Sequence, residues 1–257
     1  MKFKRFVNDP PRTPYAPTWD FRVSKSLCDD IDVNSLSQFL VKREREIKKL
    51  PPSIGSDGKK SDGYTGLGLN NTTSKFKHYN LLSWDHSEIK KLKTHIITNV
   101  IGYNNECGNK TPDELWIQCW YNVLRWGQKI KPHMHNVHSS CYLSGHFNVQ
   151  VNDTSTRYMS PINQLLDPDV IDVKNREGEI TLFPSYIFHY TTPHYSFKPR
   201  ITIAFDIRLS RSILEWNPHA IKLLKHHYLN FLPINMKSVI GSLRRKDYSI
   251  VLISRSL

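Results

Sequence analysis

The chain has 257 residues, of which 39% are hydrophobic and 23% are charged. This length suffices for one large core, and the composition argues against a wholly disordered protein. Lysine and arginine number 36 against 23 acidic residues, and residues 198–257 alone carry eleven basic and three acidic side chains. No stretch approaches eighteen consecutive apolar residues, so the sequence excludes a membrane-spanning helix.

The cysteines and the first residues bear on the cellular compartment. Four scattered cysteines form no CxxC pair, which argues against a disulfide framework or a cysteine zinc site and favours the reducing cytosol. The first fifteen residues contain two adjacent prolines and no long apolar stretch, so a secretory signal is not expected. The sequence therefore predicts a cytoplasmic protein.

The region 1–112 predicts an N-terminal arm and a set of helices and loops that pack on a core. Residues 1–25 contain four prolines and predict an irregular, extended arm. Residues 32–50 predict a helix that two prolines end, because their apolar side chains recur on one helical face. A stretch rich in glycine, serine and asparagine follows, and its segment 61–66 is a candidate lid.

A second helix is predicted to begin at the capping-box pattern Asp85-x-x-Glu88 and to end at Gly102. From residue 113 to residue 210 the pattern changes to short segments that alternate in the manner of strands and are separated by glycine or proline. This pattern predicts an antiparallel β-sandwich or barrel. Residues 211–257 predict a basic helical extension that starts at Asn217 and Pro218.

Histidines are concentrated just before the middle strands, in the segment that contains Pro132-His133-Met134-His135. In an extended segment, residues i and i+2 point to the same side, so His133 and His135 can approach one metal ion. His189, in a later strand-like segment, is the best candidate for a third ligand. His138 is a weaker candidate, because its spacing from His135 suits a turn.

A candidate anion site follows in the strand-like segment RITIAFD. Arg200 and Thr202 share one face with Ala204 and Asp206, and an inward guanidinium beside a hydroxyl is suited to a carboxylate. Because an unpaired arginine inside a barrel costs free energy, an inward Arg200 predicts an anionic partner.

These segments together resemble the iron(II)- and 2-oxoglutarate-dependent oxygenases, most closely a group found in marine viruses and bacteria. The resemblance implies a double-stranded β-helix (jelly-roll) core with flanking helices, and a hydroxylase that uses Fe(II), 2-oxoglutarate and O₂. It implies that His133, His135 and His189 bind the metal, that Arg200 and Thr202 hold the far carboxylate of 2-oxoglutarate, and that Asn122 contacts this cosubstrate.

His135 stands where most members of that family have a carboxylate, so the metal set would consist of three neutral imidazoles. Two alternatives therefore stay open: a three-histidine cupin-type dioxygenase that does not use 2-oxoglutarate, and a non-catalytic jelly-roll module with a basic binding tail. The basic surplus favours an anionic partner, such as a nucleic acid or an acidic protein. A wall of Trp116, Trp120 and Trp126 beside the site is a further hypothesis.

Overall fold

In a computed structural model, the described part of the chain forms a large and a small antiparallel sheet, a two-stranded sheet and two α-helices. The structure describes residues 1–11, 13–55, 57–135, 140–161, 170–209 and 219–224. The large sheet has the strand order β1-β2-β9-β6-β11-β5-β12, and a smaller sheet has the order β10-β7-β8. The two-layered, mainly antiparallel arrangement with flanking helices confirms the jelly-roll fold that the sequence predicts.

The strands of the large sheet come from most of the chain. They are β1 (Lys2–Asn8), β2 (Trp19–Leu27), β5 (Leu115–Leu124), β6 (Cys141–Gln150), β9 (Glu179–Pro184), β11 (Arg200–Arg208) and β12 (Ile221–Leu224). The small sheet consists of β7 (Ser155–Met159), β8 (Val170–Lys174) and β10 (His189–Thr191), and β3 (Ser53–Ile54) pairs with β4 (Lys60–Ser61).

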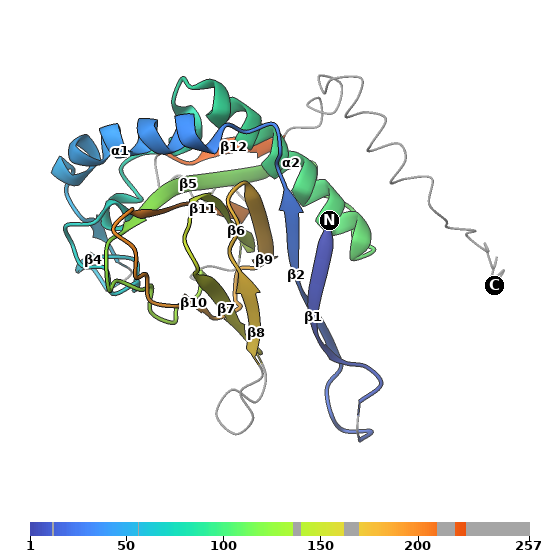
Figure 1. Ribbon diagram of the computed structural model, residues 1–257. Helices are drawn as coiled ribbons and strands as arrows, with labels where there is room; N and C mark the ends of the chain where they lie inside the picture. The colour runs from blue at the N-terminus through green and yellow to red at the C-terminus, as the bar shows by residue number, and fades with distance from the viewer. Residues whose placement is uncertain (12, 56, 136–139, 162–169, 210–218, 225–257) are drawn as a thin grey trace.

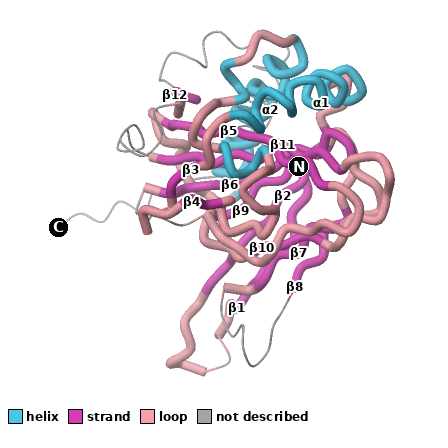
Figure 2. The backbone as a smooth tube through the Cα atoms, turned by 90° about the vertical axis from the view of Figure 1, so that its left-hand side faces the viewer, coloured by secondary structure: helices cyan, strands magenta, loops and turns pink. Residues whose placement is uncertain are grey.

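The helices cover the face of the large sheet that lies opposite the small sheet (Figures 1 and 2). They are α1 (Val33–Lys49) and α2 (Ser87–Glu106), and two 3₁₀ turns, η1 (Thr72–Lys75) and η2 (Leu81–Ser83), lie between them. The predicted first helix is confirmed: the Asp32 side chain accepts from the backbone N–H groups of Asn34 and Ser35, and the helix ends before Pro51.

Alternation along the central strands separates the hydrophobic core from the polar interior. On β11, Ile201, Ile203, Phe205 and Ile207 belong to the core that the two helices share, whereas the residues between them line a cavity. β5 has the same pattern, with Ile117, Cys119, Tyr121 and Val123 in the core. Successive strand residues point to opposite faces, so each central strand contributes to the core and to the cavity at once.

Three features outside the central strands differ from the sequence predictions. The expected irregular arm is a β-hairpin, because β1 pairs with β2 and β2 pairs with β9 in the large sheet. The expected C-terminal helix is wrong where the structure describes it, since residues 221–224 form β12 and pair with β5. The remainder of that prediction, from residue 225 to residue 257, lies outside the described residues.

The second helix is confirmed, but both of its ends differ from the prediction. His86, and not Asp85, caps α2 by accepting from the Glu88 backbone N–H, and the Glu88 carboxylate instead accepts from the Asp32 backbone N–H at 2.7 Å. The helix continues through Gly102 to Glu106, and Gly108, with φ of 71°, follows its end. A glycine in a helix interior costs free energy without ending the helix when tertiary packing holds both sides.

Candidate active site

A cavity lies between the two sheets and opens beside the segment 54–77. It receives side chains from β5, β6, β9 and β11 of the large sheet and from β7 and β10 of the small sheet. All six residues that the sequence predicts for the site line this cavity: Asn122, His133, His135, His189, Arg200 and Thr202. Residues up to 80 positions apart in the sequence thus meet in one place.

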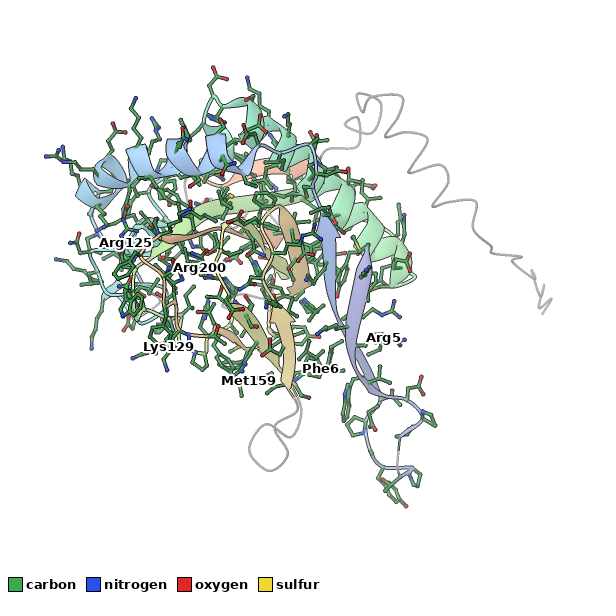
Figure 3. The ribbon with its side chains drawn as sticks, viewed as in Figure 1. Arg5, Phe6, Arg125, Lys129, Met159 and Arg200 are labelled. Atoms are coloured by element: carbon green, nitrogen blue, oxygen red, sulfur yellow. The ribbon has the colours of Figure 1, made fainter. Side chains whose placement is uncertain are left out.

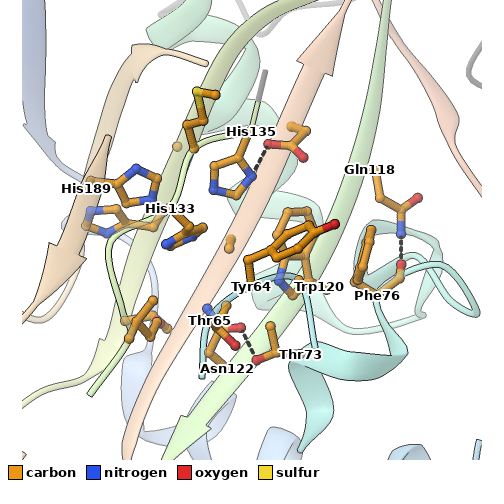
Figure 4. A pocket seen from close by; sticks show the side chains of 18 of the residues that line it. Tyr64, Thr65, Thr73, Phe76, Gln118, Trp120, Asn122, His133, His135 and His189 are labelled. Atoms are coloured by element: carbon orange, nitrogen blue, oxygen red, sulfur yellow. Dashed lines mark hydrogen bonds and ion pairs between the residues drawn. The ribbon is translucent and has the colours of Figure 1, made fainter. Parts of the chain in front are cut away.

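The structure brings the three histidines into contact (Figure 4). His133 and His189 exchange two backbone hydrogen bonds of 3.0 and 3.1 Å, and the His135 backbone N–H donates to Ser185 O at 2.9 Å. The ring centroids are 4.4 Å apart for His133 and His189, 5.0 Å for His133 and His135, and 5.1 Å for His135 and His189. One nitrogen from each ring lies within 4.8 Å of the others, so the set can hold one metal ion.

The second nitrogen of each ring is bound to an oxygen outside the cluster. Nδ1 of His133 contacts Lys131 O at 2.9 Å, and Nδ1 of His189 contacts Ile187 O at 3.1 Å. Nδ1 of His135 lies 2.9 Å from the Asp206 carboxylate, the contact that a dashed line marks in Figure 4. Because carbonyl and ionised carboxylate oxygens only accept, each Nδ1 carries the proton and each Nε2 keeps its lone pair.

Burial keeps His133 and His189 neutral. Desolvation, followed by the neighbouring His135 ring, lowers the pKa of His133 to about 4, and burial places the pKa of His189 well below its ordinary value. Burial raises the pKa of Asp206, but its contacts with His135 and Ser144 and the nearby Arg208 together lower it more, so the net pKa is below its ordinary value. At neutral pH His133 and His189 are therefore neutral and Asp206 is ionised, the protonation states that metal binding requires.

Arg200 lies deeper in the interior between the sheets (Figure 3). Only 1% of its surface is exposed, its Nε donates to Thr154 Oγ1 at 3.2 Å, and its Nη1 finds no acceptor among the described residues. Burial lowers its pKa to about 10, so the guanidinium is still charged at neutral pH. A buried cation with an unsatisfied donor favours a bound anion.

Thr202 and Asn122 lie beside Arg200, as neighbours on two paired strands. They are directly opposite in the β11–β5 register, and the Asn122 side chain accepts from Thr73 Oγ1 at 2.6 Å. His146, on β6, also lines the cavity and contacts the Tyr158 hydroxyl at 2.9 Å through Nε2. This end of the cavity thus combines one arginine with hydroxyl and amide groups.

Other predictions have mixed outcomes. His138 lies outside the described residues. The segment 61–66 borders the cavity through Gly63, Tyr64 and Thr65. The tryptophan wall is wrong for two of its three members: Trp120 lines the cavity, but Trp116 packs on Ala220 and Trp126 is exposed beside Phe197.

Sequence reasoning missed the role of Asp206, although the residue shares the strand face of Arg200. The alternation of β11 places Asp206 in the cavity, but only the fold shows that His135 reaches it. Lys77, Phe76 and Arg208 were also missed, because nothing in their local sequence marks them as cavity residues.

A family model and several solved structures are similar to this chain. Residues 118–206 match a family model described as "Putative 2OG-Fe(II) oxygenase", and no curated protein matches the chain. Among solved structures, a Pseudomonas putida prolyl-4-hydroxylase is similar at 12% identity over 73% of this chain and 92% of that chain, with a TM-score of 0.47. A Trichoplax adhaerens prolyl hydroxylase, in complex with a hypoxia inducible factor peptide fragment, has 14% identity over 72% and 83%, with a TM-score of 0.47.

The matched segment begins in β5 and ends in β11, so it contains every predicted site residue, including the three histidines that could hold a metal ion. The match to the model described as "Putative 2OG-Fe(II) oxygenase" thus covers the part of the chain that carries the candidate site.

Proposed function

We propose that His133, His135 and His189 bind the iron(II), that Arg200, Thr202 and Asn122 bind 2-oxoglutarate, and that the enzyme hydroxylates its substrate. The observation that carries this assignment is the arrangement of the three rings, each with Nδ1 bound to an outside oxygen and Nε2 left for a metal. Iron(II) and 2-oxoglutarate, when bound, supply the activation of dioxygen.

The chain's own residues position these groups. Asp206 holds the His135 ring in one tautomer and compensates part of the charge of a divalent metal bound by neutral ligands. Arg200 supplies a fixed positive charge for the far carboxylate in a buried environment, where a charge-assisted hydrogen bond is strong. Phe183 and Ile130, both buried, form apolar parts of the wall and limit access of water.

The alternatives from the sequence are less well supported. A three-histidine dioxygenase that does not use 2-oxoglutarate would leave the buried Arg200 guanidinium without an anion. The family match favours an enzyme over a non-catalytic binding module. The excess of basic residues near the C-terminus predicts a nucleic-acid or acidic-protein partner. Most of these residues follow Leu224 and lie outside the described residues, so that prediction stays open.

The cytoplasm remains our proposed location. The four free cysteines support a reducing compartment, and two of them, Cys28 and Cys119, are buried. Among the described residues, no helix has the length and apolar character needed to cross a bilayer.

Metal binding and uncoupled turnover test the proposal. We expect His133→Ala and His189→Ala to lose stoichiometric Mn(II) or Co(II) binding in a calorimetric titration, and to lose succinate formation from 2-oxoglutarate. His146→Gln is the matched control, because His146 is a buried histidine of the same cavity outside the metal set. Tight metal binding in both alanine variants would refute the assignment.

A further inference from the structure

Three exposed aromatic side chains, Trp126, Tyr195 and Phe197, gather where two loops meet, and we call them the aromatic patch. Trp126 follows the last residue of β5, and the other two lie between β10 and β11. Their exposed fractions are 56%, 66% and 94%. The Trp126 ring centroid lies 5.7 Å from that of Tyr195 and 5.1 Å from that of Phe197. None of the three lines the cavity, and a cluster of exposed apolar rings of this kind marks a binding surface.

Hydrogen bonds hold the two loops of the aromatic patch against each other. The Gly127 backbone N–H donates to His194 O at 2.7 Å, and the His194 N–H donates to Gln128 O at 2.9 Å. The His194 side chain is buried beneath the loop, and its Nε2 lies 2.7 Å from Lys198 O. The rings are thus exposed on an ordered backbone, and a surface that is ordered before its ligand arrives loses little conformational entropy on binding.

Basic side chains surround the aromatic patch. The loop residues 125–131 and 192–199 contain no aspartate and no glutamate. Their basic residues, all exposed, are Arg125, Lys129, Lys131 and Lys198. Arg125 shares the Glu44 carboxylate with Lys48, at 2.6 and 2.8 Å, so this group keeps one net positive charge. Figure 3 shows Arg125 and Lys129 on the left-hand side of the molecule.

The rings and the cations together select one class of partner. A single-stranded nucleic acid repeats a phosphate and a flat base along its length, so it can use both features at once. In a duplex the bases are already stacked within the helix and present their edges, not their faces. An acidic peptide supplies charge without a regular series of rings, and a neutral glycan would leave the cations unused.

We propose that the aromatic patch and its basic border bind single-stranded nucleic acid. Bases stack on the exposed faces of Trp126, Tyr195 and Phe197, and phosphates lie at Lys129 and Lys198. This surface is distinct from the basic residues that follow Leu224. The inference is independent of the proposed function, because the patch lies outside the cavity and needs neither metal nor 2-oxoglutarate.

The test measures binding of the full chain to a short fluorescein-labelled oligothymidylate by fluorescence anisotropy at several salt concentrations. The competitors are a duplex and a polyglutamate peptide of the same length. We expect Trp126→Ala and Phe197→Ala each to weaken oligothymidylate binding about five- to a hundred-fold, the usual effect of removing one stacked base. Both variants should keep the duplex affinity of the wild type, because a duplex bound to another basic surface does not use the rings.

The cations have a separate signature in the salt dependence. Lys129→Gln and Lys198→Gln should each reduce the slope of log affinity against log salt by about 0.7, as expected when one phosphate contact of a single strand is lost. Tyr15→Ala is the matched control for the rings, because Tyr15 is 96% exposed in the connection between β1 and β2. Lys110→Gln is the control for the charges, since Lys110 is exposed and precedes β5, whereas Trp126 follows it.

Four results would overturn the inference. They are absence of oligothymidylate binding, unchanged affinity in Trp126→Ala and Phe197→Ala, an equal loss of duplex affinity in these variants, and displacement of the oligothymidylate by polyglutamate at the same concentration as by unlabelled oligothymidylate. The last result would assign the surface to an acidic protein instead.

Discussion

Replacing Asp206 by asparagine separates the charge beside His135 from the shape of the side chain. The asparagine carbonyl can still accept from the Nδ1–H of His135, but it no longer provides a negative charge near a divalent metal. Asp206 is 8% exposed, so water compensates little of that charge. We therefore expect the substitution to act on metal affinity while the fold is retained.

The expected loss is about ten- to a hundred-fold in metal affinity, the usual effect of removing a carboxylate that orients a metal-binding histidine. At about 1.4 kcal/mol for each factor of ten, this corresponds to roughly 1.4–2.7 kcal/mol. Ser144→Ala removes only the hydroxyl that donates to Asp206 at 2.7 Å, so its effect should be smaller, about three- to ten-fold.

The assay is a competition titration of Co(II) or Mn(II) against a chelator of known affinity, without 2-oxoglutarate. Asp172→Asn is the control, because this carboxylate is half-exposed and pairs with Arg157 away from the cavity. Near-ultraviolet circular dichroism checks that each variant keeps its tertiary packing. Metal affinity in Asp206→Asn equal to that of the wild type would refute the role assigned to this carboxylate.

Three further predictions concern the cavity and the sheet around it. Arg200→Ala should weaken 2-oxoglutarate binding roughly ten- to a hundred-fold by calorimetry while Mn(II) affinity changes little, and unchanged 2-oxoglutarate affinity would contradict the assignment. Burial lowers the pKa of His146 to about 3 in the folded protein, whereas the same group has a pKa of about 6.5 when the chain is unfolded. Below pH 6.5 the unfolded state therefore binds one more proton, and the metal-free protein should lose up to about 1.4 kcal/mol of unfolding free energy per pH unit. His146→Gln should reduce this pH dependence, as measured by urea titrations at several pH values. Gly145→Ala should lower the unfolding free energy by about 1–3 kcal/mol, because the added Cβ would lie 2.5 Å from Thr181 O and from the Phe205 ring; a melting temperature like that of the wild type would show that β6 adjusts.

The central strands and the site residues on them could be predicted because local sequence determines them. Alternation along β5 and β11 assigns each side chain to the core or to the cavity, and it places Asn122, Arg200 and Thr202 correctly on the cavity face. The spacing of His133 and His135 indicates a shared side in the same way. Local periodicity suffices for such residues, since their orientation depends only on the strand to which they belong.

The features that were missed depend on contacts between distant segments. β1 and β2 are strands because they pair with each other and with β9, whereas their connection contains the prolines that suggested an irregular arm. Residues 221–224 carry apolar side chains that fit either a helix or a strand, and pairing with β5 decides between them. The contact between His135 and Asp206 spans 71 positions of the chain and has no local signal.

The order of the large sheet has a practical consequence for shortened forms of the protein. Its two outermost strands, β1 and β12, come from residues 2–8 and 221–224, far from the site in sequence. β1 presents Lys2, Lys4 and Arg5 along this border, and charged side chains of this kind discourage one sheet from joining another. A version trimmed to residues 28–218 would remove β2 and β12 and leave one edge of β9 and one edge of β5 without a neighbouring strand. Such exposed edges promote aggregation, even though every residue of the site would be present.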